Sequence, residues 1–313
     1  MTNRIAYVNG EYVDESKAVV SIFDSSLWYG DMVFDMCRTY DRKFFRLREH
    51  LNRLYDGLKI LHTDPKLSIT SLEDVCYKLA ELNDPMMDAD DEHRIMVSIS
   101  NGLLDVGQGR FDSSSKRSTV IVNDLSIKRR IGELAPLLDS GINVVIPSQR
   151  SMPAWMIDPK IKNRCRLWMK MADMEVAQHP GKNNWALMLD IDGFISEGNN
   201  SNFFMVKNGT IYTPEGRNIL RGVNRNYIFE ISELLGIPCI EKNIEPYDVK
   251  LADEAFVTGT SLTMLPVTEI NHYPIGSGTP GPVYRRLLTH WSESVGVDIE
   301  AQLRSYGTQL GLM

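Results

Sequence analysis

The stretches that decide the fold are DPKIKNRCRLWMKMADMEVAQ (158–178), NNWALMLDIDG (183–193) and FISEGNNSNFF (194–204). The middle stretch is short and apolar and ends at a glycine, which predicts a buried strand followed by a turn. The first stretch carries three lysines, two of them (Lys160 and Lys162) near its start, and the third stretch carries a glutamate in front of a turn rich in Gly and Asn. The three stretches together therefore predict a rigid support for polar side chains.

Lys162 closes an extended segment, and we expect it to open a helix. The apolar side of that helix follows the spacing of Leu167, Met171 and Met174. Packing of this side would hold the lysine away from water, and desolvation lowers the pKa of an ammonium group. A lysine without its proton near neutral pH is a nucleophile able to form a Schiff base. Lys160 has the same chemistry and stays an alternative at this point.

Glu197 follows a predicted strand, a usual place for a functional carboxylate on a rigid support. A lysine that forms an imine and an acidic partner are the pair that pyridoxal phosphate requires. A single glutamate before a glycine is more often a turn residue, and a single lysine at a helix start is more often solvated. The rest of the chain must therefore supply the other parts of such a site.

The composition predicts a globular protein with two domains. The chain has 313 residues, of which 43% are hydrophobic and 24% charged, and its formal charge is −7. The negative charge argues against a nucleic-acid partner, and no Lys/Arg run suggests an anionic membrane. No apolar run of 18 residues and no signal-peptide pattern occurs, so we expect a cytoplasmic protein that is not in a membrane. The four cysteines have no metal-ligand spacing with the six histidines, so we expect reduced thiols and no metal site.

The first part of the chain alternates strand and helix patterns. A hairpin is predicted at 5–13 around Asn9-Gly10, the pair that a tight primed turn prefers. We expect further strands near 33–40, 43–46, 94–104 and 118–124, and helices at 47–62 and 70–82. Arg53 lies beside the leucine stripe of the first helix, where it either extends to solvent or points inward at an anion.

A change of composition in DLSIKRRIGEL predicts the domain boundary. We expect a first domain at 1–125, a linker at 126–135 and a second domain at 136–313. In the second domain Gly222 precedes a helix, and a helix start exposes N–H groups that suit an anion. A later glycine turn carries several hydroxyl groups. Capping and turn chemistry explain either feature without a ligand, but two such sites and Arg53 fit a phosphate.

Six segments in this order resemble those of the class IV (fold type IV) aminotransferases that use pyridoxal phosphate. They are LWYGDMVFDMCRTY (27–40), FRLREHLNRL (45–54), DPKIK (158–162), ISEGNNSNFF (195–204), ILRGVNR (219–225) and TGTSLTMLPV (258–267). The family includes branched-chain and D-amino acid aminotransferases and aminodeoxychorismate lyase. The resemblance implies an α/β (α+β type) fold with a smaller N-terminal α/β domain and a larger C-terminal pseudo-barrel domain. It also implies a homodimer.

The resemblance implies a role for each matching residue. Lys162 matches the Schiff-base lysine, which in this register excludes Lys160, and Glu197 matches the partner of the pyridine nitrogen. Arg53 matches the phosphate arginine, whose fork of donors suits a phosphate. The other phosphate positions are the backbone donors Val223 and Asn224 and the hydroxyls Thr260 and Ser261. The substrate-pocket positions are Tyr29 and Phe34.

The chain departs from the family's pattern at three places, which leave the cofactor chemistry in place and put the identity of the substrate in doubt. Many members have Asn-Tyr shortly after the lysine, where this chain has Cys165 and Arg166, so Arg166 makes the contact with the cofactor's ring hydroxyl or the contact is lost. Where many members have Phe-Glu-Gly, this chain has Phe-Asp-Met at 34–36. Asn101-Gly102 replaces the Arg-Gly that binds a carboxylate in D-amino acid enzymes, and Arg110 in the following loop is a candidate for a movable carboxylate clamp.

The implied activity is transamination with ping-pong kinetics. An amino acid, with the branched-chain or hydrophobic type favoured, or an amine would donate the amino group to a 2-oxo acid. Two alternatives are a lyase of the aminodeoxychorismate type and a catalytically silent binding protein on the same fold.

Overall fold

The structure, a computed structural model, describes residues 4–105 and 117–313. The chain divides into two compact units. Unit 1 runs to Ile127 and also includes Ile161–Arg166. Unit 2 consists of Lys128–Lys160 and Leu167–Met313. The short segment that contains Lys162 is therefore packed with the first part of the chain, although the residues on both sides of it belong to unit 2.

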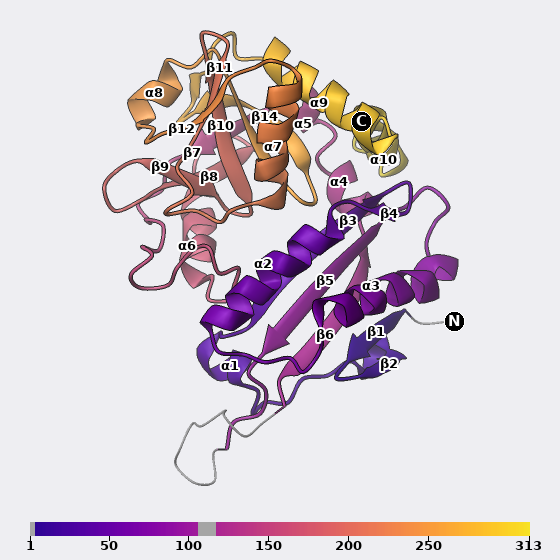
Figure 1. The fold of residues 1–313 in the computed structure, drawn as a ribbon. Helices are drawn as coiled ribbons and strands as arrows, with labels where there is room; N and C mark the ends of the chain where they lie inside the picture. The colour runs from indigo at the N-terminus through magenta and orange to yellow at the C-terminus, as the bar shows by residue number, and fades with distance from the viewer. Residues whose placement is uncertain (1–3, 106–116) are drawn as a thin grey trace. The chain divides into compact units, whose positions relative to one another are not determined.

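Within the described residues, unit 1 is built on a six-stranded sheet with the order β2-β1-β6-β5-β3-β4. All neighbouring strands are antiparallel. The strands are β1 (Ile5–Val8), β2 (Glu11–Asp14), β3 (Val33–Tyr40), β4 (Lys43–Phe44), β5 (His93–Ser100) and β6 (Thr119–Ser126). The helices are α1 (Ser25–Tyr29), α2 (Leu47–Ile60) and α3 (Ile69–Asn83), with 3-10 turns at η1 (Glu15–Lys17) and η2 (Asp84–Met86). Helices α2 and α3 lie on one face of the sheet (Figure 1).

Local sequence accounts for most of unit 1. Asn9 and Gly10 have φ angles of 52° and 105°, the left-handed conformation that a tight hairpin turn requires. The leucines of α2 face the sheet and form a core with α3 and the inner residues of β3, β5 and β6. The predicted hairpin, strands and helices of this unit are confirmed, with ends that differ by a few residues.

Within the described residues, unit 2 is built on a nine-stranded sheet with the path β12-β11-β10-β13-β14-β7-β8-β9, and β15 pairs with β14. The strands are β7 (Ile142–Val145), β8 (Asn184–Leu189), β9 (Ile195–Gly198), β10 (Ser201–Lys207), β11 (Thr210–Thr213), β12 (Cys239–Glu241), β13 (Glu254–Gly259), β14 (Thr263–Ile270) and β15 (Tyr273–Pro274). Strand β9 also pairs with β10, so the path from β10 to β9 closes on itself. This closure confirms the expected pseudo-barrel.

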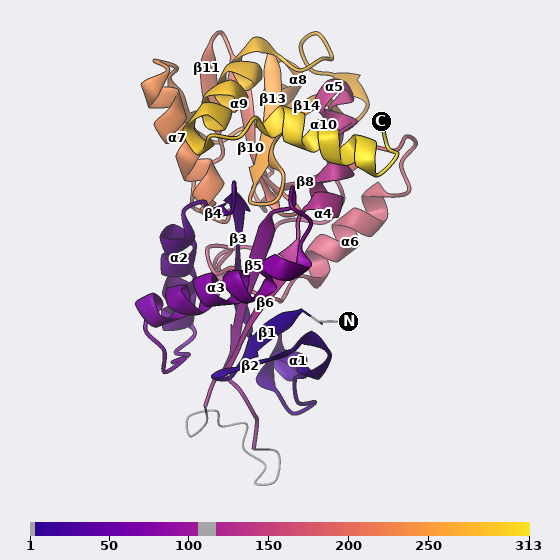
Figure 2. The same cartoon turned by 90° about the vertical axis from the view of Figure 1, so that its right-hand side faces the viewer.

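Within the described residues, the helices of unit 2 are α4 (Lys128–Gly132), α5 (Leu137–Ser140), α6 (Leu167–Val176), α7 (Val223–Leu234), α8 (Pro246–Lys250), α9 (Pro282–Val295) and α10 (Ile299–Gln309). Helices α5, α6, α7 and α9 pack on strands of the barrel. Helices α7 and α9 pack on each other and on β13 (Figure 2). No helix in the described part of the chain is both long and apolar enough to cross a membrane.

The prediction of a helix that starts at Lys162 is wrong. Helix α6 begins five residues later, at Leu167. The side predicted to be buried is exposed, since Leu167, Met171 and Met174 have exposed fractions of 72%, 46% and 57%. Ala172 and Val176 form the buried side instead. The helix is apolar on more than one side, and two different rows of its side chains recur with a helical period. The period alone therefore could not predict which of the two rows is buried.

Candidate active site

Lys162 lies in an extended segment that pairs with the first residues of β3. The Phe34 N–H donates to the Lys162 carbonyl at 2.9 Å, and the Arg164 N–H donates to the Met32 carbonyl at 3.0 Å. Val33 and Asn163 form an antiparallel bridge between these two bonds. Alternate side chains of an extended segment point to the same side, so Lys162 and Arg164 share one side with Phe34. Strand pairing, and not a helix start, therefore positions the lysine.

The Phe34 ring is the common neighbour of three cations. Lys162 Nζ lies 4.9 Å from the ring centroid, Arg164 Cζ 3.8 Å and Arg166 Cζ 5.7 Å. A cation within about 6 Å of an aromatic centroid is attracted by the negative face of the ring. Phe34 is itself buried, with an exposed fraction of 3%. Two of the residues predicted for the site, Phe34 and Arg166, are thus brought together with Lys162 in unit 1.

Arg53 points inward from α2 and binds a buried carboxylate. Its Nε and Nη2 donate to the two oxygens of Asp35, both at 2.8 Å, and the Asp35 side chain has an exposed fraction of 2%. His50 Nδ1 lies 2.8 Å from the same carboxylate. Burial opposes ionisation of Asp35, but Arg53 and His50 outweigh it and hold the pKa of this carboxyl well below its usual range. Burial lowers the pKa of His50, although Asp35 acts against this shift.

Tyr29, a further predicted residue of unit 1, ends α1 and is half exposed. Its carbonyl accepts a hydrogen bond from Cys165 Sγ at 3.1 Å, and Gly30 leaves room for that sulfur, since a Cβ at Gly30 would lie 2.7 Å from it. Cys165 therefore packs against Tyr29 and Gly30, at the C-terminal end of α1. Arg110 lies outside the described residues.

In unit 2, Glu197 lies on β9 and is buried, with an exposed fraction of 5%. One of its oxygens accepts the Leu220 N–H at 3.1 Å and the Asn202 Nδ2 at 3.4 Å. Asn202 is the partner of Glu197 in the β9–β10 pair, and it also donates to the Leu220 carbonyl at 2.9 Å. This asparagine therefore links the carboxylate to the segment that leads into α7.

Val223 and Asn224 are the first residues of α7, whose cap residue Gly222 offers no side chain to its N–H groups. A Cβ at Gly222 would lie 2.1 Å from Asn202 Oδ1, so glycine allows the helix start to approach the strand closely. Asn224 Nδ2 donates to the Gly259 carbonyl at 3.0 Å. The helix start is thus tied to the turn between β13 and β14.

Thr260 and Ser261 form that turn, and both are half-buried. Beside it, Thr258 Oγ1 and Asn224 Oδ1 are buried and have no hydrogen-bond partner in the described part of the chain. Buried polar atoms of this kind call for a ligand or a water. Hydroxyl groups and a helix start supply hydrogen-bond donors for a phosphate ester, and a buried carboxylate supplies an acceptor for a protonated pyridine nitrogen. Unit 2 therefore brings together all of its predicted cofactor residues and fits the group.

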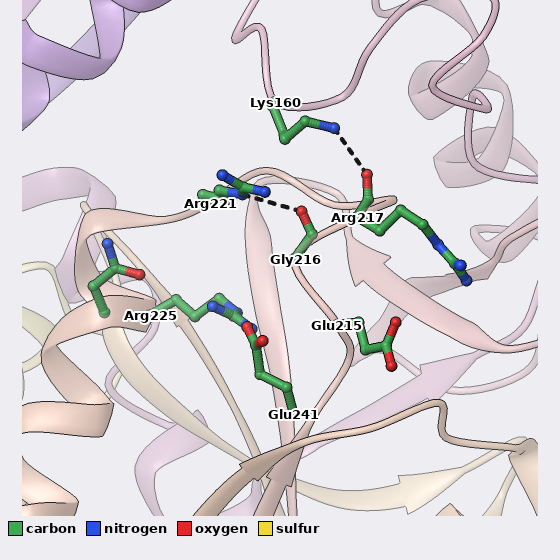
Figure 3. Close-up of a pocket in the computed structure, with 8 residues that line it drawn as sticks. Lys160, Glu215, Gly216, Arg217, Arg221, Arg225 and Glu241 are labelled. Carbon is green, nitrogen blue, oxygen red and sulfur yellow. Dashed lines mark hydrogen bonds and ion pairs between the residues drawn. The ribbon is translucent and has the colours of Figure 1, made fainter.

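Lys160, the alternative to Lys162, has a different environment. It lines a polar cavity of about 570 Å³ in unit 2 (Figure 3). Its Nζ lies 2.7 Å from Asp158 and 3.0 Å from the Arg217 carbonyl. In the same cavity Arg225 forms an ion pair with Glu241 and donates to the Pro214 carbonyl. The ammonium of Lys160 is thus held by acceptors of its own unit.

Sequence reasoning missed the residues that support the predicted ones. Asp35 was noted only as a departure from the family, yet it holds Arg53. His50 lies three residues before Arg53, a helical spacing that places both on one side and could have indicated the pair. Asn202 follows Glu197 by five residues, and only a hairpin at that point makes them neighbours. Arg164 carried no signal beyond its distance of two residues from Lys162.

The chain is similar to known proteins over nearly its whole length. Residues 32–270 match the family described as amino-transferase class IV. The putative branched-chain-amino-acid aminotransferase of Methanocaldococcus jannaschii is 33% identical over 282 residues, which cover 90% of this chain and 93% of that protein. The crystal structure of the Escherichia coli branched-chain amino acid aminotransferase has a TM-score of 0.85 at 28% identity, and the match covers 93% of this chain and 94% of that one.

A third similar protein has been crystallised with a bound compound. The T.th. branched-chain amino acid aminotransferase complexed with N-(5'-phosphopyridoxyl)-L-glutamate has a TM-score of 0.82 at 27% identity, with 94% of this chain and 95% of that chain covered. Class IV aminotransferases depend on pyridoxal phosphate and take an amino acid and a 2-oxo acid as substrates. With the closed barrel of unit 2 and the matched segments of both units, these similarities show that the chain belongs to the class IV aminotransferase family and is an aminotransferase.

Proposed function

We propose that this aminotransferase binds pyridoxal phosphate and moves the amino group of branched-chain and other hydrophobic amino acids to a 2-oxo acid. The similarity to enzymes named for branched-chain amino acids over nearly the whole chain supports the substrate class. The observation that carries the cofactor is the set of buried polar groups in unit 2. Glu197, the start of α7 and the β13–β14 turn are linked by hydrogen bonds, and Thr258 Oγ1 beside them lacks a partner in the described residues.

In this proposal the residues of unit 2 hold the phosphate and the ring nitrogen. The N–H groups of Val223 and Asn224 and the hydroxyls of Thr260 and Ser261 donate to phosphate oxygens. The carboxylate of Glu197 accepts a hydrogen bond from the protonated pyridine nitrogen and so keeps the proton on the ring. Burial of this carboxylate strengthens the interaction, because charges attract more strongly away from water.

The resemblance to the family assigns cofactor roles to residues of unit 1 as well. Arg53 donates to the phosphate, and its bonds to Asp35 fix the direction of the guanidinium. Arg166 would contact the ring hydroxyl of the cofactor. Lys162 is the catalytic residue, held next to β3 by the backbone bond from Phe34. Tyr29 and Phe34 contact the substrate side chain, and Arg110 remains the predicted carboxylate clamp.

When bound, the cofactor would supply withdrawal of electrons from the α carbon of the amino acid, which would make the proton on that carbon acidic. Lys162 Nζ would take this proton from the α carbon and move it to the cofactor's side of the imine bond. Glu197 keeps the ring nitrogen protonated throughout, which stabilises the negative charge that develops. The same groups act in reverse order when the 2-oxo acid receives the amino group, so both substrates use one site in turn.

We also propose a homodimer in the cytoplasm. Support for an interface comes from the apolar side chains that the 19–29 segment exposes. They are Val19, Val20, Ile22, Phe23, Leu27, Trp28 and Tyr29. Clusters of exposed apolar side chains often mark contacts between proteins. Light scattering of the purified protein tests the dimer, and a mass of one chain would contradict it.

The visible spectrum tests the cofactor and the lysine together. Purified protein is incubated with pyridoxal phosphate, and the spectrum is recorded before and after borohydride, which attaches the cofactor permanently to its lysine. We expect a cofactor band in wild type that borohydride removes, and a modified peptide that contains Lys162. Lys162→Ala should lose the band. Lys160→Ala is the matched control and should keep it, because Lys160 is held by Asp158 and Arg217.

The substrate class is tested by adding amino acids to the loaded wild type. Bleaching of the band by leucine, isoleucine and valine, and its recovery with a 2-oxo acid, is the expected result. Release of pyruvate without any acceptor would favour the lyase. A wild type with no band would mean that the fold is present without the chemistry.

A further inference from the structure

The polar cavity that contains Lys160 is lined by charged side chains from several segments of unit 2. Its volume of about 570 Å³ lies within the range of about 300–1,000 Å³ that is usual for small-molecule sites. Four of its lining residues are cations, namely Lys160, Arg217, Arg221 and Arg225. Figure 3 shows Lys160, Arg221 and Arg225 on different segments around this space.

These cations outnumber the carboxylates of the cavity. The carboxylates in the lining are Glu215 and Glu241, and Asp158 pairs with Lys160 at 2.7 Å. Four cations against three carboxylates leave an excess of positive charge, even with Asp158 included. The whole chain has a formal charge of −7, so its overall composition does not account for a basic cavity. The cavity therefore favours anions.

Two of the arginines have N–H groups that the described part of the chain does not engage. The Arg225 side chain has an exposed fraction of 4%, and it donates to the Pro214 carbonyl at 3.0 Å and pairs with Glu241. Its Nε is buried and has no hydrogen-bond partner in the described residues. Within residues 4–105 and 117–313, no hydrogen bond or ion pair engages the Arg217 side chain. A buried N–H without a partner calls for a ligand or a water.

The lining selects a compact anion with more than one charged group. Apart from Gly216, the lining residues carry charged or amide side chains, which offer little to an apolar body. Two of the cations are held in place by backbone carbonyls, since Lys160 Nζ bonds to that of Arg217 at 3.0 Å and Arg221 Nε to that of Gly216 at 3.2 Å. A guanidinium donates in a fixed fork that matches phosphate and carboxylate oxygens. An anion with two or more such groups can contact several of these cations at once.

The cavity is separate from the residues assigned to the cofactor in unit 2. Asn224 donates to the Gly259 carbonyl, in the turn between β13 and β14. The next residue, Arg225, instead bonds to Glu241 on β12 and to the Pro214 carbonyl after β11. Successive residues of a helix lie about 100° apart around its axis. The start of α7 therefore presents Asn224 and Arg225 to different parts of the barrel.

We infer that this cavity binds a compact anion with two or more phosphate or carboxylate groups, at a site separate from that of the cofactor. Lys160, Arg217, Arg221 and Arg225 hold the anion, and the exposed carboxylate of Glu215 weakens its binding. The inference goes beyond the proposed function and does not depend on it, because none of these residues has a role in the transfer of the amino group.

Calorimetric titration of the cofactor-loaded protein with pyrophosphate, citrate and acetate tests the site. Loading removes the alternative that an added anion takes the place of the cofactor's own phosphate. We expect pyrophosphate or citrate to bind at one site per chain, and the better of the two identifies phosphate or carboxylate as the preferred group. Acetate has a single charged group and should bind at least about tenfold more weakly, since it loses hydrogen bonds to charged groups.

Three variants assign the binding to this cavity. Arg217→Gln should raise the Kd about tenfold or more, the usual effect of removing a hydrogen bond between charged groups. Arg286→Gln is the matched control, because it makes the same change of charge at an exposed position on α9 of the same unit, and its Kd should equal that of wild type. Glu215→Gln should lower the Kd about two- to fivefold, because it removes an exposed like charge. Such a gain cannot result from a damaged fold.

The inference is overturned if neither pyrophosphate nor citrate shows saturable binding, or if Arg217→Gln and Arg286→Gln have the same Kd. Loss of the cofactor band on addition of pyrophosphate would also overturn it, since the anion would then occupy the cofactor's site. A wild type that forms no cofactor band contradicts the proposed function instead. The same titrations of the unloaded wild type and variants then decide whether the cavity binds the anion.

Discussion

The substitution Asp35→Asn tests the buried ion pair that holds Arg53. The carboxylate of Asp35 accepts bonds from Arg53 Nε and Nη2 and from the Met36 N–H, and it also contacts His50. An asparagine keeps the size but replaces one acceptor with a donor and leaves the arginine without its counter-ion. Since the Arg53 side chain has an exposed fraction of only 12%, water cannot fully replace the lost partner. Removing one member of a buried pair costs about 3–5 kcal/mol, and we expect the lower end of this range because Asn retains one acceptor.

Urea unfolding followed by circular dichroism measures this loss. With a slope of about 1–3 kcal/mol per molar urea, a loss of about 3 kcal/mol lowers the midpoint of unit 1 by about 1 M or more. Asp64→Asn is the matched control, because Asp64 forms an exposed ion pair with Lys66 in the same unit. We expect its midpoint to equal that of wild type. If Asp35→Asn also unfolds at the wild-type midpoint, Arg53 does not depend on Asp35 and the reasoning is refuted.

The loss of stability in Asp35→Asn should depend on pH. The folded pKa of Asp35 is lowered, so its contribution to the free energy of unfolding is present above the unfolded pKa of about 3.9 and is lost as pH falls through the folded pKa. The difference between wild type and Asp35→Asn should therefore be constant from neutral pH down to about pH 5 and should shrink below about pH 4. A difference that grows on acidification would contradict the assigned charge.

Two further predictions concern His93 and Gly222. Burial opposes protonation of His93, but its contacts with Asp124 and Asp84 outweigh burial and raise its pKa, so its stabilisation is present below about pH 6.5 and is lost as pH rises through the folded pKa. Thermal unfolding should show a larger loss for His93→Gln at about pH 5.5 than at about pH 8.5, and equal losses would contradict the ion pairs. Gly222→Ala places a Cβ 2.1 Å from Asn202 Oδ1 and must displace the asparagine that contacts Glu197. Absorbance titration with pyridoxal phosphate should then give a Kd at least about tenfold higher than wild type, as expected for a loss of more than about 1.4 kcal/mol, and an unchanged Kd would separate this turn from the cofactor.

Much of the fold was predictable from local sequence. The Asn9-Gly10 turn, the leucine stripe of α2 and the glycine before α7 are signals within a few residues, and each corresponds to an observed element. Local signals of this kind work because turn conformations and apolar periods depend on neighbouring residues alone. The six matched segments also sufficed to identify the family, since their order and content do not depend on how the elements pack.

The sequence by itself thus determined the types of element, the family and the residues to test. Only the tertiary structure decided which of these residues meet. Asp35 reaches Arg53 across 18 positions, the Lys162 segment pairs with β3 from more than a hundred residues away, and the barrel closes where β9 meets β10. It also decided which side of α6 is buried, where two apolar stripes were available. These features depend on burial and on the pairing of distant backbone groups. Such contacts contribute to the free energy only once the chain has folded, so propensities of short segments do not predict them.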